Sequence, residues 1–254
     1  MKKVFPKKWL GQHFLNDDQI ALDITNYLTP GTKNVLEIGP GMGVLTTHLL
    51  TQNYNLKLIE IDTESVAYLK SQYENINDKI IEGDFLKYDL NSVFNEPFSV
   101  IGNFPYNISS QILFKALENK PLINEIVGMF QKEVAERICS KKGNRTYGIL
   151  SVLVQAFFSV EYLKTVNPES FTPPPKVKSA VIRITRKENQ EINCNEADYF
   201  RVVKKAFNQR RKKLRNALSE FQFKPDVPPE IFQKRAEELG VEDFVLLTQN
   251  LIKM

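Results

Sequence analysis

Polar and aromatic side chains follow an apolar run that ends at Ile101, and their types could carry out chemistry on a base. The run leads into Asn103-Phe104-Pro105-Tyr106. An amide oxygen can accept hydrogen bonds from an exocyclic amine, and an aromatic ring can stack on a base with roughly 1–3 kcal/mol of stabilisation. A base held in this way must leave its helix. The tetrapeptide indicates a pocket for an unstacked base, and an ordinary turn with two buried aromatic residues is the alternative.

A glycine-rich turn follows an earlier apolar run. Gly39, Gly41 and Gly43 alternate with other residues after Ile38 and lead into a helical pattern. Glycines at such a turn allow the backbone to pass close to a ligand at the carboxyl edge of a sheet. The third glycine comes one residue too early for a dinucleotide fingerprint, which disfavours nicotinamide cofactors. A tight structural turn is the alternative for this motif.

Carboxylates stand at the ends of the next two predicted strands. Glu60 can accept hydrogen bonds from both ribose hydroxyls of an adenosine group, and it would repel a ribose phosphate. Asp84 can accept a hydrogen bond from the exocyclic amine of adenine. Either acid alone could be an ordinary exposed strand end. Together with the glycine turn they indicate an adenosine-bearing cofactor without phosphates, and S-adenosylmethionine fits this description, whereas the P-loop pattern of an ATPase is absent.

Methyl transfer to an exocyclic amine would give each part of the tetrapeptide a role. The nitrogen lone pair of such an amine is delocalised into the ring, so the amine is a poor nucleophile. The Asn103 side-chain oxygen and a backbone carbonyl held by the Pro105 turn can hold the amine hydrogens out of the ring plane, while Tyr106 stacks on the base. We therefore predict that Asn103, Pro105 and Tyr106 are the catalytic residues.

The elements that must position these residues alternate along the chain. Short β-branched or apolar runs predict strands, and helical patterns such as those at 44–50 and 64–73 lie between most of them. This alternation predicts an α/β fold with a Rossmann-like, mostly parallel sheet of the S-adenosylmethionine-dependent methyltransferase type. The predicted strands cover residues 35–38, 56–61, 79–81, 98–101 and 126–130.

We expect an antiparallel hairpin to close one edge of this sheet. Two further strands are predicted at 160–166 and 180–185, on either side of the proline-rich loop FTPPPKVKS. From about residue 187 the chain becomes polar and then helical, with no β signal. The prediction is therefore a catalytic, cofactor-binding domain over residues 1–186 and a small C-terminal α-helical domain over 187–254.

Composition excludes several classes of protein. The apolar content of 42% and charged content of 25% are typical of a globular protein. The two cysteines and two histidines have no ligand spacing, so we expect no metal site and no disulfide framework. The N-terminus lacks the apolar core of a signal peptide, and no apolar stretch is long enough to span a bilayer. We expect a cytoplasmic protein that does not bind a membrane.

The net charge of +4 is distributed unevenly. Residues 201–215 contain eight basic side chains and no acidic one, and four lysines lie among the first eight residues. Such concentration of positive charge favours a polyanionic partner. If residues 201–221 form one helix, about 100° per residue places a basic stripe over roughly 120° beside an apolar arc, although a solvated helix face is the alternative. The stripe predicted to bind the RNA backbone includes Arg201, Lys204, Arg211, Lys212 and Arg215.

The chain resembles the small-subunit ribosomal RNA adenine dimethyltransferases from about Lys8 to its C-terminal helices. The resemblance implies that two methyl groups are transferred from S-adenosylmethionine to N6 of each of two adjacent adenosines. These adenosines lie in a hairpin loop near the 3′ end of 16S rRNA, and a role in 30S subunit biogenesis is implied, with rRNA binding by residues 187–254. We expect a monomer. The motifs that carry the resemblance are GQHFL, EIGPGMGVLT, EID, GDFL, GNFPYNIS, FQKEVAERI, FTPPPKVKSAVIRI and AFNQRRKKLRNAL.

The resemblance also implies roles for individual residues. No carboxylate base is needed, because the N6 proton becomes acidic after methylation and can leave to water. Phe171, in FTPPPKV, is expected to form one wall of the base pocket, with a plain edge loop as the alternative. The implied cofactor contacts are His13, Leu15, Gly39, Gly41, Glu60, Asp84 and Asn103.

Two positions depart from the family pattern. His13 stands where bacterial members usually have asparagine, so a polar contact to the cofactor is retained in altered form. Phe104 stands where leucine is usual. Because the backbone carbonyl is the group expected to act there, the chemistry should persist, but the wall of the substrate pocket is expected to be bulkier.

Two other functions stay open from the sequence. One is a resistance-type methylase that modifies an adenosine of large-subunit rRNA. The other is a non-catalytic ribosome assembly factor with the same fold. The motif AFNQRRKKLRNAL and the length of the helical tail favour the small-subunit enzyme, while the intact glycine turn and Asn103 argue against a non-catalytic protein.

Overall fold

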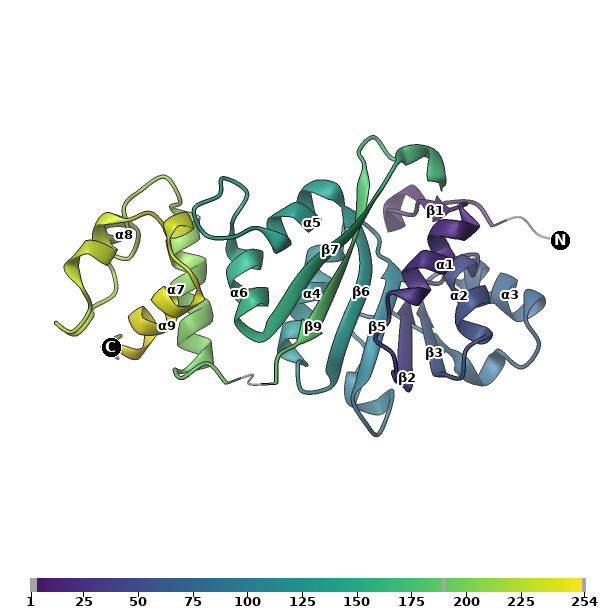
Figure 1. Cartoon of the computed structure of the whole chain (residues 1–254). Helices are drawn as coiled ribbons and strands as arrows, with labels where there is room; N and C mark the ends of the chain where they lie inside the picture. The colour runs from purple at the N-terminus through teal and green to yellow at the C-terminus, as the bar shows by residue number, and fades with distance from the viewer. Residues whose placement is uncertain (1–3, 189–190, 253–254) are drawn as a thin grey trace. The chain divides into compact units, whose positions relative to one another are not determined.

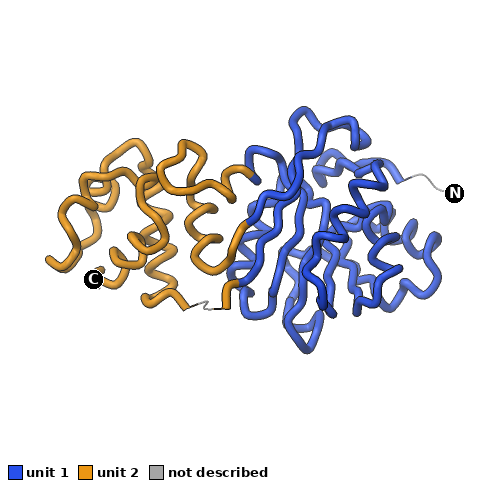
Figure 2. The backbone as a smooth tube through the Cα atoms, in the orientation of Figure 1, with its two compact units in different colours: residues 1–135, 161–186 blue, residues 136–160, 187–254 orange. Residues whose placement is uncertain are grey.

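The computed structural model describes residues 4–188 and 191–252 of the chain (Figure 1). The chain forms two compact units (Figure 2). The first consists of Met1–Ala135 and Glu161–Arg186, and the second of Glu136–Val160 and Lys187–Met254. This division differs from the expected 1–186 and 187–254 in one stretch, because residues 136–160 group with the C-terminal segment. The apolar helix α6 (Ile149–Phe157) lies in that stretch and packs on α7 (Glu196–Asn208) and α9 (Val241–Gln249).

A seven-stranded sheet has the order β4-β3-β2-β5-β6-β9-β7. The first five strands in this order are parallel, whereas β9 is antiparallel to β6. The mostly parallel sheet with an antiparallel edge region is confirmed. The strands are β2 (Asn34–Ile38), β3 (Asn55–Glu60), β4 (Ile80–Glu82), β5 (Phe98–Asn103), β6 (Ile123–Gln131), β7 (Phe158–Val166) and β9 (Ser179–Arg186).

The sheet order reverses between β2 and β5. The chain moves outward from β2 to β3 and β4, and then returns to the other side of β2 to form β5. Open α/β sheets bind ligands outside the carboxyl ends of the strands at such a switch point. The glycine turn, which follows β2, and Asn103, which ends β5, therefore face the same crevice.

The central strands are apolar on both faces because both faces are covered. Along β2 and β5 almost every residue is buried, including Leu36 and Ile101. Parallel strands covered in this way read as continuous apolar runs, which explains why the sequence located them. The helices that follow the strands are α2 (Val44–Leu50), α3 (Thr63–Gln72), α4 (Ser109–Glu118) and α5 (Lys132–Cys139), and α1 (Asp18–Asn26) precedes the sheet.

A second, two-stranded sheet joins distant parts of the first unit. The strand β1 (Phe14–Leu15) pairs antiparallel with β8 (Phe171–Thr172). The backbone N–H of Asn16 also donates to the carbonyl of Ser170, at 2.9 Å. Residues 4–16, which we call the N-terminal arm, are therefore held against the proline-rich segment between β7 and β9.

Apart from the first residues of β7, the second unit consists of helices and turns. Its core contains Tyr199, Val202, Phe244 and Leu247, all buried. Besides α6, α7 and α9 it contains the short helix α8 (Leu214–Ala217). None of the helices within the described residues is long and apolar enough to cross a membrane. The second unit also contains the short 3-10 helices η5 (Pro229–Gln233) and η6 (Ala236–Glu238), whereas the first unit contains η1 (Lys8–Leu10), η2 (Asn77–Lys79), η3 (Leu90–Ser92) and η4 (Pro168–Ser170).

The predicted single helix over residues 201–221 is wrong. Helix α7 ends at Asn208, and α8 begins only at Leu214. Lys213, which precedes α8, has an extended backbone with ψ of 149°. The six residues between Phe207 and Leu214 are all polar, so a helix there would have no apolar side chain to bury. The helical period consequently breaks in the middle of the basic segment.

Candidate cofactor and substrate site

A cavity of about 160 Å³ lies at the carboxyl ends of β2, β3 and β5 in the first unit. Five segments line it: the N-terminal arm, the glycine turn, the end of β3, the loop after β4 and the loop after β5. The structure thus brings together most of the residues that the sequence predicted for catalysis and cofactor binding. Those that line the cavity are His13, Gly39, Gly41, Glu60, Asp84, Asn103, Phe104, Pro105 and Tyr106.

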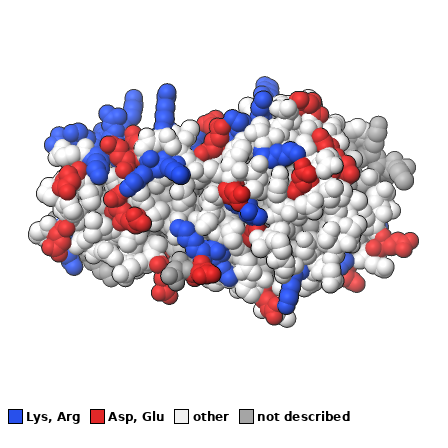
Figure 3. Space-filling model, in the orientation of Figure 1, with Lys and Arg blue, Asp and Glu red and all other residues white. Residues whose placement is uncertain are grey.

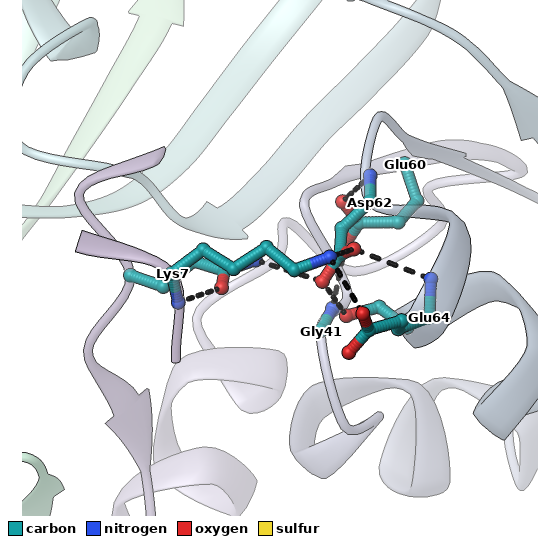
Figure 4. Close-up of polar contacts among 7 residues, drawn as sticks. Lys7, Gly41, Glu60, Asp62 and Glu64 are labelled. Atoms are coloured by element: carbon teal, nitrogen blue, oxygen red, sulfur yellow. Dashed lines mark hydrogen bonds and ion pairs between the residues drawn. The ribbon is translucent and has the colours of Figure 1, made fainter. Parts of the chain in front are cut away.

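Glu60 is fixed in the cavity wall by the backbone. Its side chain is buried, one carboxylate oxygen accepts the N–H of Gly41 at 3.0 Å, and the other accepts the N–H of Asp62 at 2.9 Å (Figure 4). Burial raises the pKa of Glu60, and the two backbone hydrogen bonds oppose this shift. Since each oxygen has a further lone pair, the carboxylate can still accept hydroxyl donors from a ligand.

The glycine turn requires glycine at two of its positions. Gly41 has φ of +57°, and a Cβ there would lie 3.0 Å from the ring of Phe14. Gly43 has φ of +82°, and a Cβ there would lie 2.7 Å from the hydroxyl of Tyr73. Larger residues would be both strained and crowded at these positions. The turn therefore brings bare backbone to the cavity, as the cofactor prediction requires.

Lys7, which the sequence indicated only as part of a basic N-terminus, fastens the N-terminal arm. Its Nζ lies 2.5 Å from Asp62 and 3.3 Å from Glu64, as Figure 4 shows. Burial would raise the pKa of Asp62, but hydrogen bonds from Lys7 and Ser65 outweigh it and hold that pKa below its usual value. The backbone N–H of Lys7 also donates to Gln12, at 2.8 Å. These contacts hold the arm residues beside the cavity that they line.

The orientation of the Asn103 amide is set by the arm. Its Nδ2 donates to the backbone carbonyl of His13 at 2.8 Å. This contact identifies the other end of the amide as the oxygen, because a carbonyl can only accept. Among the described residues, no group donates a hydrogen bond to that oxygen. Asn103 therefore offers an acceptor at the tip of β5, as the sequence predicted.

His13 and Tyr106 stack on each other at the cavity. Their ring centroids are 5.4 Å apart, with 27° between the planes. His13 Nδ1 lies 2.7 Å from the carbonyl oxygen of Pro173, so this nitrogen carries the proton that is donated. The Tyr106 hydroxyl shares a hydrogen bond with Ser179, and burial raises the pKa of Tyr106. His13 therefore lies against one face of the Tyr106 ring.

Phe104 lines the cavity, but its ring lies in the core. The Phe104 side chain is 1% exposed and packs edge-on against Phe130, with centroids 5.2 Å apart. A Cβ at Gly128 would lie only 2.2 Å from its ring, and one at Gly102 only 2.8 Å. The two glycines therefore leave room in the core for the ring of Phe104.

Two other predicted residues lie behind the cavity. Leu15 is buried and lines a small adjoining cavity of about 30 Å³, together with Gly39 and Asn103. Phe171 pairs with Leu15 across the small sheet, is 2% exposed and packs in the core of the first unit. Phe171 is therefore not among the residues that line the cavity. The proline-rich segment instead contacts His13, through the backbone carbonyl of Pro173.

Glu37 was not among the site residues predicted from the sequence. This β2 residue is buried, and Thr46 donates to its carboxyl group at 2.7 Å. Burial raises its pKa to about 8. Glu37 also lines the small cavity beside the glycine turn. The sequence feature that could have identified it is an acidic residue inside an otherwise apolar predicted strand.

The basic segment of the second unit is exposed, but acids accompany it. Figure 3 shows Lys and Arg side chains gathered on the part of the molecule that contains α7 and α8. Arg201 pairs with Asp198 at 3.0 Å, and Lys205 pairs with Glu220 at 2.5 Å. The acid-free single stripe is therefore wrong. Arg201 and Lys204 belong to α7, whereas Arg211 and Lys212 lie in the break and Arg215 lies in α8, and the last three are exposed.

The doubly wound sheet, its antiparallel strand and the acidic cavity define an S-adenosylmethionine-dependent methyltransferase of the α/β class. A family model described as ribosomal RNA adenine dimethylase matches residues 6–243. The chain belongs to this family and is an enzyme.

Similar proteins agree with this assignment. The chain is 57% identical to the ribosomal RNA small subunit methyltransferase A of Flavobacterium johnsoniae, covering 99% of this chain and 97% of that protein. It is 56% identical to the protein of the same name from Cytophaga hutchinsonii, with 99% of both chains covered. Among solved structures, a dimethyladenosine transferase from Plasmodium falciparum superposes with a TM-score of 0.77 at 30% identity, covering 92% of this chain and 96% of that one.

Proposed function

We propose that this protein dimethylates N6 of each of two adjacent adenosines in a hairpin loop near the 3′ end of 16S rRNA. The substrate is the 30S subunit during its biogenesis, so the enzyme acts in the cytoplasm, and it acts as a monomer. The observation that carries the proposal is the Asn103 amide, whose NH2 group is held by the His13 carbonyl at 2.8 Å. Its oxygen is left as an acceptor for the substrate amine.

The residues of the cavity fit S-adenosylmethionine. Gly39 and Gly41 provide bare backbone, and Glu60 provides a fixed carboxylate for the ribose hydroxyls. Asp84 is held by the N–H of Leu86 at 2.9 Å and can accept from the adenine amine. His13 and Leu15 complete the cofactor side. When bound, S-adenosylmethionine supplies an electrophilic methyl group.

The chain supplies orientation and hydrogen-bond acceptors for the reaction. The Asn103 oxygen and the Phe104 backbone carbonyl accept the two hydrogens of the substrate amine, which frees the nitrogen lone pair from the ring. Pro105 fixes the turn that positions this carbonyl. Tyr106 stacks on the base with the ring face that His13 does not cover. After methylation the N6 proton leaves to water.

The relatives favour the small subunit over the large one. Two proteins named ribosomal RNA small subunit methyltransferase A share 57% and 56% identity with nearly the whole chain. The 23S rRNA methyltransferase ErmE is 24% identical and supports only the common fold. Binding of 16S rRNA is assigned to the second unit, through Arg211, Lys212 and Arg215.

The test is methyl transfer to purified ribosomal subunits. The protein is incubated with methyl-labelled S-adenosylmethionine and unmethylated small subunits, and the rRNA is digested to nucleosides. We expect N6,N6-dimethyladenosine from two adjacent positions near the 3′ end. Large subunits serve as the matched control and should take up no label. Label in the large subunit alone would support the resistance-type activity, and no label in either would support the non-catalytic assembly factor.

A further inference from the structure

The second unit contains a groove that the proposed function does not use. It has a volume of about 390 Å³ and runs between α7 and the turn that follows α8. Two aromatic residues, Phe200 and Phe221, line it together with Arg201, Lys204 and Asn208. All of these residues lie in the C-terminal part of the chain, so the groove belongs to one compact unit.

The groove side of α7 is separate from its packing side. Residues 197, 200, 201, 204, 205 and 208 line the groove, and their spacing of three and four places them on one face of the helix. The opposite face buries Tyr199, Val202, Val203 and Ala206 in the core. Phe200 is only half-buried, although it also approaches Phe157 at 6.3 Å. The core therefore does not require the groove side to be basic and aromatic.

Both aromatic rings of the groove are paired with cations. The Arg201 guanidinium lies 5.2 Å from the ring centroid of Phe221, and Lys204 Nζ lies 5.9 Å from that of Phe200. Asp198 holds Arg201 from the side at 3.0 Å, yet 55% of the Arg201 side chain stays exposed. A guanidinium is planar, and unstacked RNA bases stack on such planes as well as on aromatic rings. Arg201 and Phe221 together form a stacking platform that is open to solvent.

The charge of the groove favours an anion beside this platform. Its lining includes three bases, Arg201, Lys204 and Lys205, and one acid, Glu220, which pairs with Lys205 at 2.5 Å. Exposed ion pairs are weak, so a phosphate can compete for Lys205. Asn208 adds an exposed amide that can read a base edge. An acidic peptide would satisfy the charge but would leave the stacking platform unused.

We propose that this groove binds one unpaired nucleotide of the rRNA, at a distance along the RNA from the nucleotides that are methylated. The base stacks on Arg201 over Phe221, Asn208 contacts its edge, and Lys204 and Lys205 contact the phosphate. The assignment of RNA as the ligand rests on the proposed function. The groove therefore adds recognition of RNA shape to the phosphate contacts of the exposed basic segment.

The test separates stacking from charge with one substitution. Arg201→Lys keeps the positive charge but removes the planar group, and Arg235→Lys, at an exposed arginine of the same unit, is the matched control outside the groove. The full-length variants are titrated with a labelled single-stranded RNA 12-mer and with a 12-base-pair RNA duplex, and Kd is measured by fluorescence anisotropy. For Arg201→Lys we expect single-strand binding to weaken roughly five- to tenfold, with duplex binding unchanged. Arg235→Lys should change neither.

A second variant, Phe221→Leu, keeps apolar volume and removes the aromatic ring. It should reproduce the weaker single-strand binding, and thermal unfolding and circular dichroism establish whether it is folded. Wild-type single-strand affinity in both groove variants would overturn the inference, as would tighter binding of a polyglutamate peptide than of the 12-mer. These results would leave the proposed function intact if the wild type methylates small subunits. Absence of that methylation, with the single-strand effect present, would refute the proposed function alone.

Discussion

Glu60 in the cavity of the first unit is 4% exposed and both of its oxygens accept backbone N–H groups, whereas Arg201 beside the groove of the second unit has 55% of its side chain exposed. In the cavity, fixed hydrogen bonds set the positions of the charged and polar groups. In the second unit, basic side chains form ion pairs with acidic residues elsewhere in the same unit, such as Arg201 with Asp198 and Lys205 with Glu220. Interactions of the first kind depend on geometry, while those of the second kind are screened by salt.

The difference indicates a division of tasks within the enzyme. A methyl-transfer site needs acceptors that do not reorganise during the reaction, and backbone hydrogen bonds provide them. A surface that collects a large polyanion needs charge that acts over distance and can exchange partners. Substitutions in the two regions should therefore affect different measurements.

The largest expected effect is the fall in turnover of Asn103→Ala. Removal of one hydrogen-bond acceptor for the reacting group should lower the rate of methyl transfer about 10²- to 10³-fold. Affinity for S-adenosylmethionine should stay within a few-fold, since Glu60 and the glycine turn are unchanged. Single-turnover transfer and calorimetric cofactor binding measure the two quantities separately.

Asn107→Ala is the control for this experiment, because Asn107 is another asparagine that lines the same cavity. It should retain near-normal turnover. If Asn103→Ala turns over like wild type, Asn103 has no part in the reaction.

Glu60→Gln should weaken cofactor binding by about 10- to 100-fold. One carboxylate oxygen becomes an NH2 group that faces a backbone N–H, and the remaining lone pairs no longer serve both ribose hydroxyls. Hydrogen bonds to charged groups contribute about 1.5–3 kcal/mol, which gives this range. Isothermal calorimetry provides the measurement. Glu64→Gln, an exposed neighbour that contacts Lys7, is the control, and equal weakening in both variants would contradict the assignment.

Reversal of Arg211 and Arg215 to Glu should weaken small-subunit binding about tenfold and leave cofactor binding unchanged. The slope of log affinity against log salt should become shallower by about one unit for each phosphate that is no longer neutralised. A salt titration of subunit binding measures both effects. The control reverses Lys141 and Lys224, two exposed lysines of the same unit, with the same change in net charge. If this control weakens binding as much, affinity for the small subunit depends only on the net charge of the protein.

The last expected effect is on stability instead of activity, and it concerns the buried acid Glu37. Because its pKa is about 8 when folded and 4.5 ordinarily, the folded state keeps a proton between pH 4.5 and 8 that the unfolded state releases. Stability therefore falls as pH rises through this window, by at most about 1.4 kcal/mol per pH unit. Glu37→Gln should remove this dependence. Urea unfolding at pH 5, 6, 7 and 8 without cofactor is the measurement, and parallel stability profiles for both proteins would contradict it.

The sheet and the cavity were predictable from the sequence for a physical reason. Central parallel strands are buried on both faces and read as apolar runs, and their carboxyl ends meet at one edge. The residues after those runs, such as Gly41, Glu60 and Asn103, could therefore be placed together from the order of the runs alone.

Contacts between distant segments could not be predicted in this way. The Lys7 ion pair spans 55 residues and the bond from Asn103 to His13 spans 90, and neither leaves a local pattern. The burial of Phe104 depends on Gly102 and Gly128, of which the second lies on another strand. The break after α7 was visible in the sequence as six consecutive polar residues. Because residues 201–221 were treated as one helix, neither that break nor the groove beside Phe221 was predicted.

The hydrogen bond between His13 and Pro173 also bears on when the enzyme becomes active during its synthesis. The two residues are separated by 160 positions. At roughly 5–20 residues per second, translation needs about 10–30 s to supply the second partner after the first. Until then the N-terminal arm has nothing on that side to dock against, and the strand β9 is also missing from the sheet. A nascent chain still attached to the ribosome therefore lacks a closed methylation site until almost the whole first unit has been made.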